Sequence, residues 1–414
     1  MNASGAYRGR ILLGSFFGVT CGYSSTYFYS SGLFLIPVSR DLGLTRGQVS
    51  LANLGNFFLI AALAPLLGRA VDRFGARSVG ILSLLGLAVA FLLCAWLTSG
   101  LWTLVGTSLL IALLGGGSSS VSFSRLVVDA FDRRRGMALA FMQTGAGVGA
   151  FLIPLILSTD LNASDWRAAY RTLAYIVLAA ALVVALLIHA TPIAGTSAIR
   201  SSKAVNDVGG RDVWKMRAFR MLAAAFFLAG AALAGAVVHF VPMMIDGGVS
   251  SAQAAKLASV LGVALICGRL LIGLLLDRFV PEIVAATVLL VTSVGLTVLA
   301  FAGAAIGVVG AIFVGAGIGS EVDLLSYLTA RHFPRERYGT AYGGTFGVFL
   351  FGSATGPALI GFLFDRTGSY RSGYLLAALF LISAAMFAAR LRHLYFPSID
   401  PIPAAARSTA RCQQ

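Results

Sequence analysis

Apolar residues fall in runs of about 20 along nearly the whole chain, long enough as helices to span the ~30 Å hydrocarbon core of a bilayer. Short breaks containing charged residues, Gly or Pro separate these runs. The pattern predicts an all-α polytopic membrane protein with twelve transmembrane helices, at residues 11–37, 50–71, 79–98, 102–124, 136–157, 170–190, 219–243, 254–276, 283–302, 305–328, 340–364 and 373–392.

The composition excludes a water-exposed globular domain of this length. Of the 414 residues, 58% are apolar and 11% are charged, and the mean hydropathy is +0.88. A soluble domain carries about 25% charged residues, so this chain has too few polar side chains to cover a surface in water. We therefore expect no soluble enzyme.

The net charge of +15 does not indicate a nucleic-acid partner, because the basic residues lie in separate loops. If the N-terminus is cytoplasmic, and basic residues at the ends of spans are assigned to the adjacent side, 23 of the 31 Lys and Arg residues lie on the cytoplasmic side and 7 on the exterior side. Only Arg269 lies well inside a span. The positive-inside rule then places both termini in the cytoplasm. The four cysteines form no metal or disulfide spacing, and we expect no cofactor and no metal.

The two halves of the chain align at a constant offset of 205 residues. Eight identities lie at this offset, including Pro37 with Pro242, Asp41 with Asp246, and Asp72 with Asp277. The chain is therefore predicted to be a tandem duplication. We expect an N-terminal six-helix half at 1–190, a cytoplasmic linker at 191–218, a C-terminal six-helix half at 219–392 and a cytoplasmic tail at 393–414.

Six spans return the chain to its starting side, so the two halves are predicted to be pseudo-symmetric about an axis along the membrane normal. This is the parallel-repeat arrangement of secondary transporters, in which rocking of the halves alternately exposes a site between them. The 48 glycines suit such a bundle, because small residues let helices pack closely in lipid.

The loop after the second span carries a family signature. Residues 68–77 read GRAVDRFGAR, which resembles the G-x-x-x-D-R-x-G-R-[KR] motif of the major facilitator superfamily, and GLLLDR follows at 273–278. The resemblance implies the major facilitator fold and a cytoplasmic gate that includes Asp72, Arg73, Asp277 and Arg278. Arg125 is spaced to pair with Asp129 or to latch onto Asp72.

Further stretches resemble the monocarboxylate porter group, which includes the bacterial oxalate/formate exchangers. These are RGMALA at 135–140, GFLFDRTGSY at 361–370, and Arg269 four residues before Gly273. The resemblance implies that Arg269 binds substrate and that the protein lies in a bacterial inner membrane. Leu265 stands where that group often has Asp, and the eleventh span lacks Lys, which disfavours a dicarboxylate held by two cations.

A buried charge in a span needs a partner or a wet cavity. For Arg269 the partner is either a substrate carboxylate, which matches the planar guanidinium, or a structural acid, Glu321 or Asp323. These acids lie two residues apart and point about 200° apart on a helix, so only one can face a given cavity. Either is a candidate proton carrier. Asp323, Tyr327 and Arg331 share a face, which suggests an Asp–Arg network at the cytoplasmic gate.

Other polar residues are candidates for the transport path. Tyr23, Tyr27 and Ser31 recur on one face of the first span, so we expect them to line the central cavity and contact substrate. Gln143 in the fifth span is a further candidate contact. His239 in the seventh span is either a proton-coupling group or a packed helix contact.

The sequence therefore predicts a secondary active transporter of small organic anions, monocarboxylates above all, by proton symport or anion exchange. Its expected partners are the anion, the bilayer and a co-transported proton, and we expect a monomer. The alternative within the same class is an exporter of amphiphilic or drug-like compounds. A membrane enzyme or receptor has little support, because the loops are too short for a catalytic or sensory domain.

The predicted topology can be tested by labelling. Ser202→Cys lies in the linker, so an impermeant thiol reagent should label it in inverted vesicles and not in intact cells. A cysteine at Ser250, in a predicted exterior loop, is the control and should react in intact cells. Labelling of Ser202→Cys from outside would contradict the orientation.

Overall fold

The computed structural model describes residues 3–131, 135–162, 165–189 and 213–394, and these residues are overwhelmingly helical. The linker predicted at 191–218 lies mostly outside them, as does the tail at 393–414. The principal helices are α1 (Ala3–Thr20), α2 (Ser31–Leu42), α3 (Arg46–Phe74), α4 (Ala76–Leu97), α5 (Leu101–Gly115), α6 (Ser120–Ala130), α7 (Arg135–Asn162), α8 (Trp166–His189), α10 (Arg217–Asp246), α11 (Ser251–Arg278), α12 (Pro281–Ala302), α13 (Gly307–His332), α14 (Arg335–Thr367) and α15 (Arg371–Leu391).

These helices make twelve passes through the bundle. Ten segments are long and apolar enough to cross a membrane, and one of them, Pro281–His332, contains both α12 and α13. The remaining pass is the first, in which α1 and α2 are separate helices. The chain is an all-α polytopic membrane protein, as the hydrophobic runs predict.

The first pass differs from the single helix expected over 11–37. Between α1 and α2 lies a π-helical turn, Ser24–Phe28. The fourth pass is also interrupted, by a 3₁₀ turn at Gly116–Ser118. The two interruptions meet, because the Tyr23 backbone N–H donates to Ser118 Oγ at 3.1 Å. This hydrogen bond links the two irregular segments. It satisfies a backbone N–H that has no water to bind in the membrane interior.

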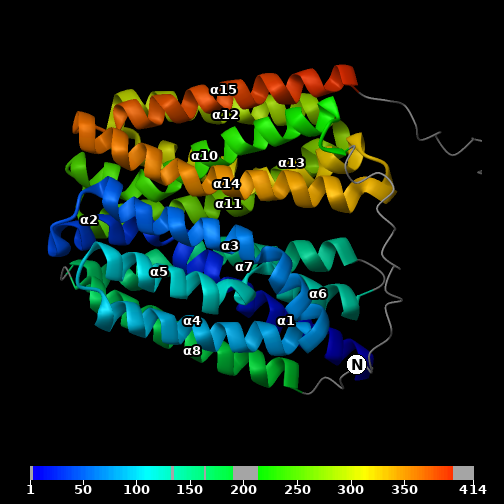
Figure 1. Cartoon of the computed structure of the whole chain (residues 1–414), viewed down its shortest axis with the longest axis horizontal. Coiled ribbons are helices and arrows are strands. Elements are labelled where there is room, and N and C mark those ends of the chain that lie inside the picture. Colours follow the sequence, from blue (N-terminus) through cyan, green and yellow to red (C-terminus); the bar gives the residue numbers. More distant parts are fainter. Residues whose placement is uncertain (1–2, 132–134, 163–164, 190–212, 395–414) are drawn as a thin grey trace, which may run out of the picture.

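The bundle has two halves, visible as the lower group of helices, α1–α8, coloured blue to green, and the upper group, α10–α15, coloured green to red (Figure 1). Helices α1–α8 pack among themselves, and so do α10–α15. Across the boundary, α3 packs on α14, α7 on α11, and α2 on α10. This is the arrangement of two six-helix halves that the internal repeat predicts.

Glycines set the closest helix contacts. A Cβ at Gly352 or Gly356 of α14 would overlap a backbone carbonyl of α10, those of Phe227 and Ala231 respectively. Between the halves, Gly262 of α11 meets the α7 backbone where Gly147 lies. In a bilayer such contacts replace the hydrophobic driving force between helices with van der Waals packing.

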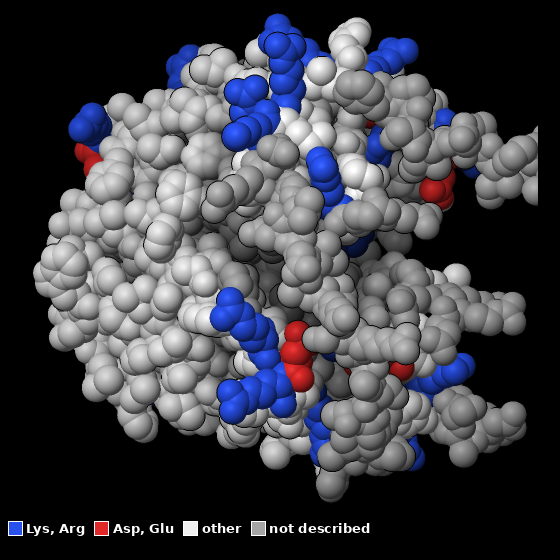
Figure 2. Space-filling model, turned by 45° about the vertical axis from the view of Figure 1, so that its right-hand side comes forward, with Lys and Arg blue, Asp and Glu red and all other residues white. Residues whose placement is uncertain are grey.

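The two ends of the bundle differ. At the end where α2 leads into α3, called the opposite end below, Arg46 of the first half pairs with Asp246 of the second. At the end where α1 begins, called the N-terminal side, each ion pair among the described residues stays within one half. Figure 2 looks toward this side, where Lys and Arg lie on both halves around a hollow. The bundle is closed at the opposite end and open at the N-terminal side.

The α10–α14 contact predicts a difference between two glycines of one helix. Gly356→Ala places a methyl group against the Ala231 carbonyl and should destabilise the protein by about 1–3 kcal/mol, the usual cost of overpacking. Gly347→Ala is the matched control, since nothing lies within 4 Å of its Cβ position. Thermal unfolding in detergent measures both. Equal melting temperatures for the two variants would contradict the close contact.

Candidate functional site

Arg269 lies in α11, on the side of that helix that faces α7 and α13. Its Nε is 3.2 Å from Asp323 Oδ2, and its Nη1 donates to the Gln143 backbone carbonyl at 3.3 Å. Asp323 belongs to the same half as Arg269, whereas Gln143 belongs to the other. The guanidinium therefore joins the two halves, and its side chain is 15% exposed.

Two residues of the first half, Gln143 and Tyr29, lie near this guanidinium. The Gln143 side-chain Oε1 is buried with no hydrogen-bond partner among the described residues, so the contact with Arg269 uses the backbone. Tyr29, at the end of the π-helical turn, lies within electrostatic range of both Arg269 and Glu321. The candidate site thus combines residues from both halves.

The two acids of α13 have different surroundings. Asp323 is paired with Arg269, and its side chain is 41% exposed. Glu321 is 4% exposed, and within the described ranges its Oε1 has no partner. Asp323 is accessible to exchange with solvent or ligand, whereas Glu321 is an isolated buried carboxyl.

The hydroxyl face predicted on the first span lies elsewhere than expected. The Tyr27 hydroxyl donates to Asn53 Oδ1 of α3 at 2.9 Å, and the Tyr23 hydroxyl donates to Asn56 Oδ1. Both tyrosines are 5% exposed. Ser31 Oγ donates to the Phe28 carbonyl. These groups are satisfied inside the first half, and Tyr27 and Ser31 border a small cavity there rather than the space between halves.

Asn53 and Asn56 of α3 accept these tyrosine hydrogen bonds, and the pattern of the first span does not predict them. They are buried in α3, and Asn56 Nδ2 also donates to the Ser108 carbonyl of α5. Two Asn side chains at i and i+3 in an apolar run need hydrogen-bond partners inside the protein, so the sequence of α3 indicates a buried polar contact there. They explain why Tyr23 and Tyr27 turn toward α3.

The family signature lies at the N-terminal side. Arg125 of α6 is 3.7 Å from Asp72 Oδ1 and 3.1 Å from Asp129 Oδ2, so both proposed pairings occur together. Arg73 is exposed and lies over the Phe74 ring. All these contacts stay in the first half.

The second signature does not repeat this arrangement. Asp277 and Arg278 are exposed at the end of α11. Arg331 pairs with Glu282 at 2.8 Å, and so does His332 at 2.9 Å. The predicted network of Asp323 with Arg331 is therefore wrong, because Asp323 is bound to Arg269. Glu282 occupies the repeat position of Arg77, so this half has an acid where the first half has a base.

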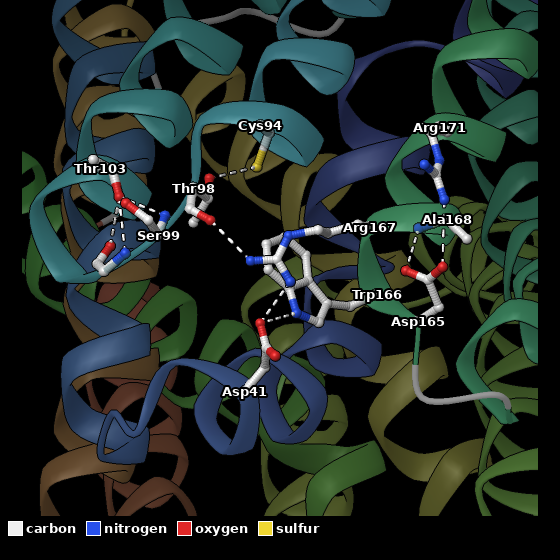
Figure 3. A network of polar contacts seen from close by, with 11 residues as sticks. Asp41, Cys94, Thr98, Ser99, Thr103, Asp165, Trp166, Arg167, Ala168 and Arg171 are labelled. Carbon is white, nitrogen blue, oxygen red and sulfur yellow. Dashed lines mark hydrogen bonds and ion pairs between the residues drawn. The ribbon is translucent and has the colours of Figure 1, made fainter.

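At the opposite end, a network within the first half holds Asp41 (Figure 3). Arg167 Nη1 donates to Asp41 at 2.6 Å and Trp166 Nε1 at 3.1 Å, and Arg167 also donates to the Thr98 carbonyl. The Arg167 hydrogen bond, with that from Trp166, holds the pKa of Asp41 below its ordinary value. Trp166 is 1% exposed, so it is a structural anchor of this network.

His239 of α10 lies near the same end. It is fully buried, its Nε2 is 2.8 Å from the Pro357 carbonyl, and its ring packs on Tyr370. It is distant in sequence and in contacts from Arg269. The structure therefore separates this predicted coupling residue from Glu321 and Asp323.

Two six-helix halves, closed at one end and meeting at a shared polar site, define a membrane transporter. The match to known families agrees: the model described as Major Facilitator Superfamily covers residues 15–349 and 248–411. The chain belongs to the major facilitator superfamily, whose members are transporters rather than enzymes.

Curated relatives match over part of their length. Multidrug resistance protein MdtL of Klebsiella pneumoniae (strain 342) is 27% identical over 159 residues, which cover 37% of this chain and 40% of the relative. The Multidrug resistance protein B homolog of Mycobacterium tuberculosis (strain ATCC 25618 / H37Rv) is 28% identical over 127 residues, 31% of this chain and 23% of the relative. The matched stretches thus span less than half of these relatives.

Solved structures match over nearly the whole chain. A bacterial homolog of the human lysosomal transporter Spinster, inward-facing and occupied, has a TM-score of 0.74 at 17% identity and covers 95% of this chain and 99% of its own. A D-xylose–proton symporter has a TM-score of 0.74 at 15% identity, with coverages of 92% and 97%. These likenesses establish the fold.

The signature carboxylates should act on conformation more than on binding. Asp72→Asn and Asp277→Asn lie at the rim, away from Arg269, so each should change the transport rate several-fold with substrate affinity within about twofold. Asp129→Asn, which removes only the i,i+4 partner of Arg125, is the control and should have the smaller effect on rate. Transport kinetics and equilibrium binding on purified variants measure this. Wild-type turnover with tenfold weaker binding would contradict a gate role.

Proposed function

We propose that this transporter carries small organic anions, monocarboxylates above all, by alternating access between its two halves. The observation that supports this most is the position of Arg269. It reaches the boundary between the halves and contacts the Gln143 carbonyl across it. A ligand held there would touch both halves, so its binding would favour their closure.

Arg269 suits a carboxylate for chemical reasons. Its planar fork offers two parallel donors to the two carboxylate oxygens, which a Lys ammonium cannot do. Tyr29 of the first half is close enough to Arg269 for the two groups to interact electrostatically, so its hydroxyl would be a further donor to the anion. Tyr29 replaces Tyr23 and Tyr27 in the proposed site, because their hydroxyls are already bonded to α3.

Asp323 supplies a coupling step. It occupies the same guanidinium that the substrate needs, so substrate and Asp323 compete for Arg269. Protonation of Asp323 at its carboxylate oxygen would release Arg269 for the anion. One proton would then enter with one monocarboxylate, and the site would keep its net charge. In the exchange mode, a second anion would displace the first without protonation of Asp323.

The orientation follows from the basic residues. We place the N-terminal side in the cytoplasm, because that assignment puts most Lys and Arg inside. The hollow between the halves then faces the cytoplasm, and the conformation is inward-facing. The expected setting is a bacterial inner membrane, since the curated relatives come from bacteria.

An exporter of amphiphilic or drug-like compounds is the second candidate. It is favoured by the two relatives called multidrug resistance proteins and by Glu321, a buried carboxyl whose Oε1 has no described partner and which could receive a cationic group. A substrate panel in proteoliposomes, with and without a proton gradient, separates the candidates. Transport of cationic amphiphiles that survives loss of Arg269 would favour the exporter.

The anion proposal predicts that charge alone at position 269 is insufficient. Arg269→Lys and Arg269→Gln should each weaken monocarboxylate binding by about ten- to a hundredfold, because a charge-assisted hydrogen bond contributes about 1.5–3 kcal/mol. Arg390→Lys, at an exposed position of α15, is the control and should bind normally. Binding is measured by calorimetry or by scintillation proximity.

A double variant separates binding from structure. Arg269→Gln leaves Asp323 without its cation and should lower the melting temperature, and Asp323→Asn in the same protein should restore it. Restored stability without restored binding supports the substrate role. A well-folded Arg269→Gln protein that binds monocarboxylates as tightly as wild type would eliminate the proposal.

A further inference from the structure

The internal repeat is broken at the opposite end of the bundle. Asp41 and Asp246 are repeat equivalents, but Asp41 is held by Trp166 and Arg167 of its own half. The positions equivalent to Trp166 and Arg167 in the second half are Arg371 and Ser372. Arg371 lies over the Phe301 ring, and Ser372 carries no charge. Asp246 takes its cation from the other half.

That cation is Arg46, the first residue of α3. Its Nη2 donates to Asp246 Oδ1 at 2.8 Å, and its Nη1 donates to the Tyr370 hydroxyl at 2.6 Å. Its guanidinium also lies 4.0 Å from the centre of the Phe364 ring. All these partners belong to the second half. Arg46 can therefore contact this polar and aromatic group of the second half only while the halves are together.

A second contact closes the same end. The α3 N-terminus points at Asp365 of α14, whose carboxylate accepts hydrogen bonds from the Arg46 and Gly47 backbone N–H groups at 3.1 and 2.8 Å. The backbone of α3 can reach α14 because Gly47 and Gly361 face each other. A helix N-terminus favours an anion, so this contact also joins opposite charges across the boundary.

His239 lies directly beneath this closure. Its Nε2–H donates to the Pro357 carbonyl, which leaves Nδ1 as an acceptor, and Nδ1 is buried with no partner among the described residues. Ser50 Oγ of the first half is 3.5 Å from Nε2, and Tyr370 covers the ring face. The side of His239 that faces the first half is covered only while α3 packs on α14.

From this geometry we infer that His239 is the proton-binding site of the gate at the opposite end, and that the gate closes only over the neutral imidazole. The inference concerns the gate and is independent of the substrate and of Arg269. A proton on Nδ1 would add a charge and a donor at a buried position that has no described acceptor, which opposes closure. Separation of α3 from α14 exposes the ring to water, where the proton is accommodated.

The charged groups around His239 do not offset the cost of burying a protonated imidazole. Arg46 donates to Tyr370, whose ring packs on His239, and its positive charge opposes a second one on the imidazole. Asp246 is committed to the Arg46 guanidinium, and Asp365 to the α3 N-terminus. Tyr370 and Ser50 stay neutral between pH 5.5 and 7.5, and aspartates titrate below this range. His239 is thus the group facing the closure whose ordinary pKa, about 6.5, falls within it.

Double electron–electron resonance tests the inference. Spin labels at Arg40→Cys and Gln253→Cys, both exposed at this end, report its opening in nanodiscs when the four native cysteines are replaced. Between pH 7.5 and 5.5 the ratio of open to closed molecules should rise about tenfold in the otherwise wild-type protein, since one proton is bound on opening. The same series in an Arg46→Gln background, which weakens the closure, brings both populations into the measurable range.

Variants of the histidine decide the outcome. His239→Gln keeps a donor for Pro357 without a titratable group, so the ratio should change less than twofold over the same pH range; His239→Asn is the second variant. His393→Gln, exposed near the other end of the bundle, is the control and should keep the full response. A pH response that persists in both His239 variants, or no response in the wild-type and Arg46→Gln backgrounds, would overturn the inference.

Discussion

A bilayer offers no water to a buried charge, and this constraint organises the polar residues of the whole bundle. Arg269 is stable within a span because Asp323 and the Gln143 carbonyl complete its environment. Arg46 is stable at the closed end because Asp246, Tyr370 and Phe364 do the same. In both cases a partner lies in the other half, so satisfying the charge also holds the halves together.

Two arginine side chains, Arg46 and Arg269, each make a contact across the boundary between the halves, but with different sets of partners. The described partners of the Arg46 guanidinium, Asp246, Tyr370 and Phe364, all belong to the other half. Arg269 instead divides its contacts between Asp323 of its own half and the Gln143 carbonyl of the other. Separation of the halves would therefore remove these partners from Arg46, whereas Arg269 would keep Asp323.

The fold could be predicted from the sequence because span length and loop charge are strong local signals. The twelve passes, the two halves and the superfamily all follow from runs of apolar residues and from residues 68–77. The side-chain directions could not be predicted to the same extent. Helical spacing placed Tyr23 and Tyr27 on the cavity face, but the π-helical turn shifts the register, and Asn53 and Asn56 draw these hydroxyls toward α3.

The candidate site, too, is only partly predictable from the sequence. Arg269 is identifiable from the sequence because it is the one basic residue well inside a predicted span, and its pairing with an acid of α13 is one of the two predicted alternatives. Tyr29 was missed because it lies off the regular hydroxyl face, and Glu282 because it departs from the repeat. Where one half departs from the repeat, the partner of the side chain lies on a distant segment, as Arg331 does for Glu282. The spacing of apolar residues along the chain carries no information about such contacts.

The contact of Gly147 with Gly262 joins the halves at unequal distances from the two ends of the bundle. Along α11, Gly262 is about 17 Å from the end at Ser251 and about 24 Å from the end at Arg278, at 1.5 Å per residue. A rotation of one half about this contact would therefore move the N-terminal side about half as far again as the opposite end. The two ends would then open to different widths for the same rotation, with the wider opening at the N-terminal side.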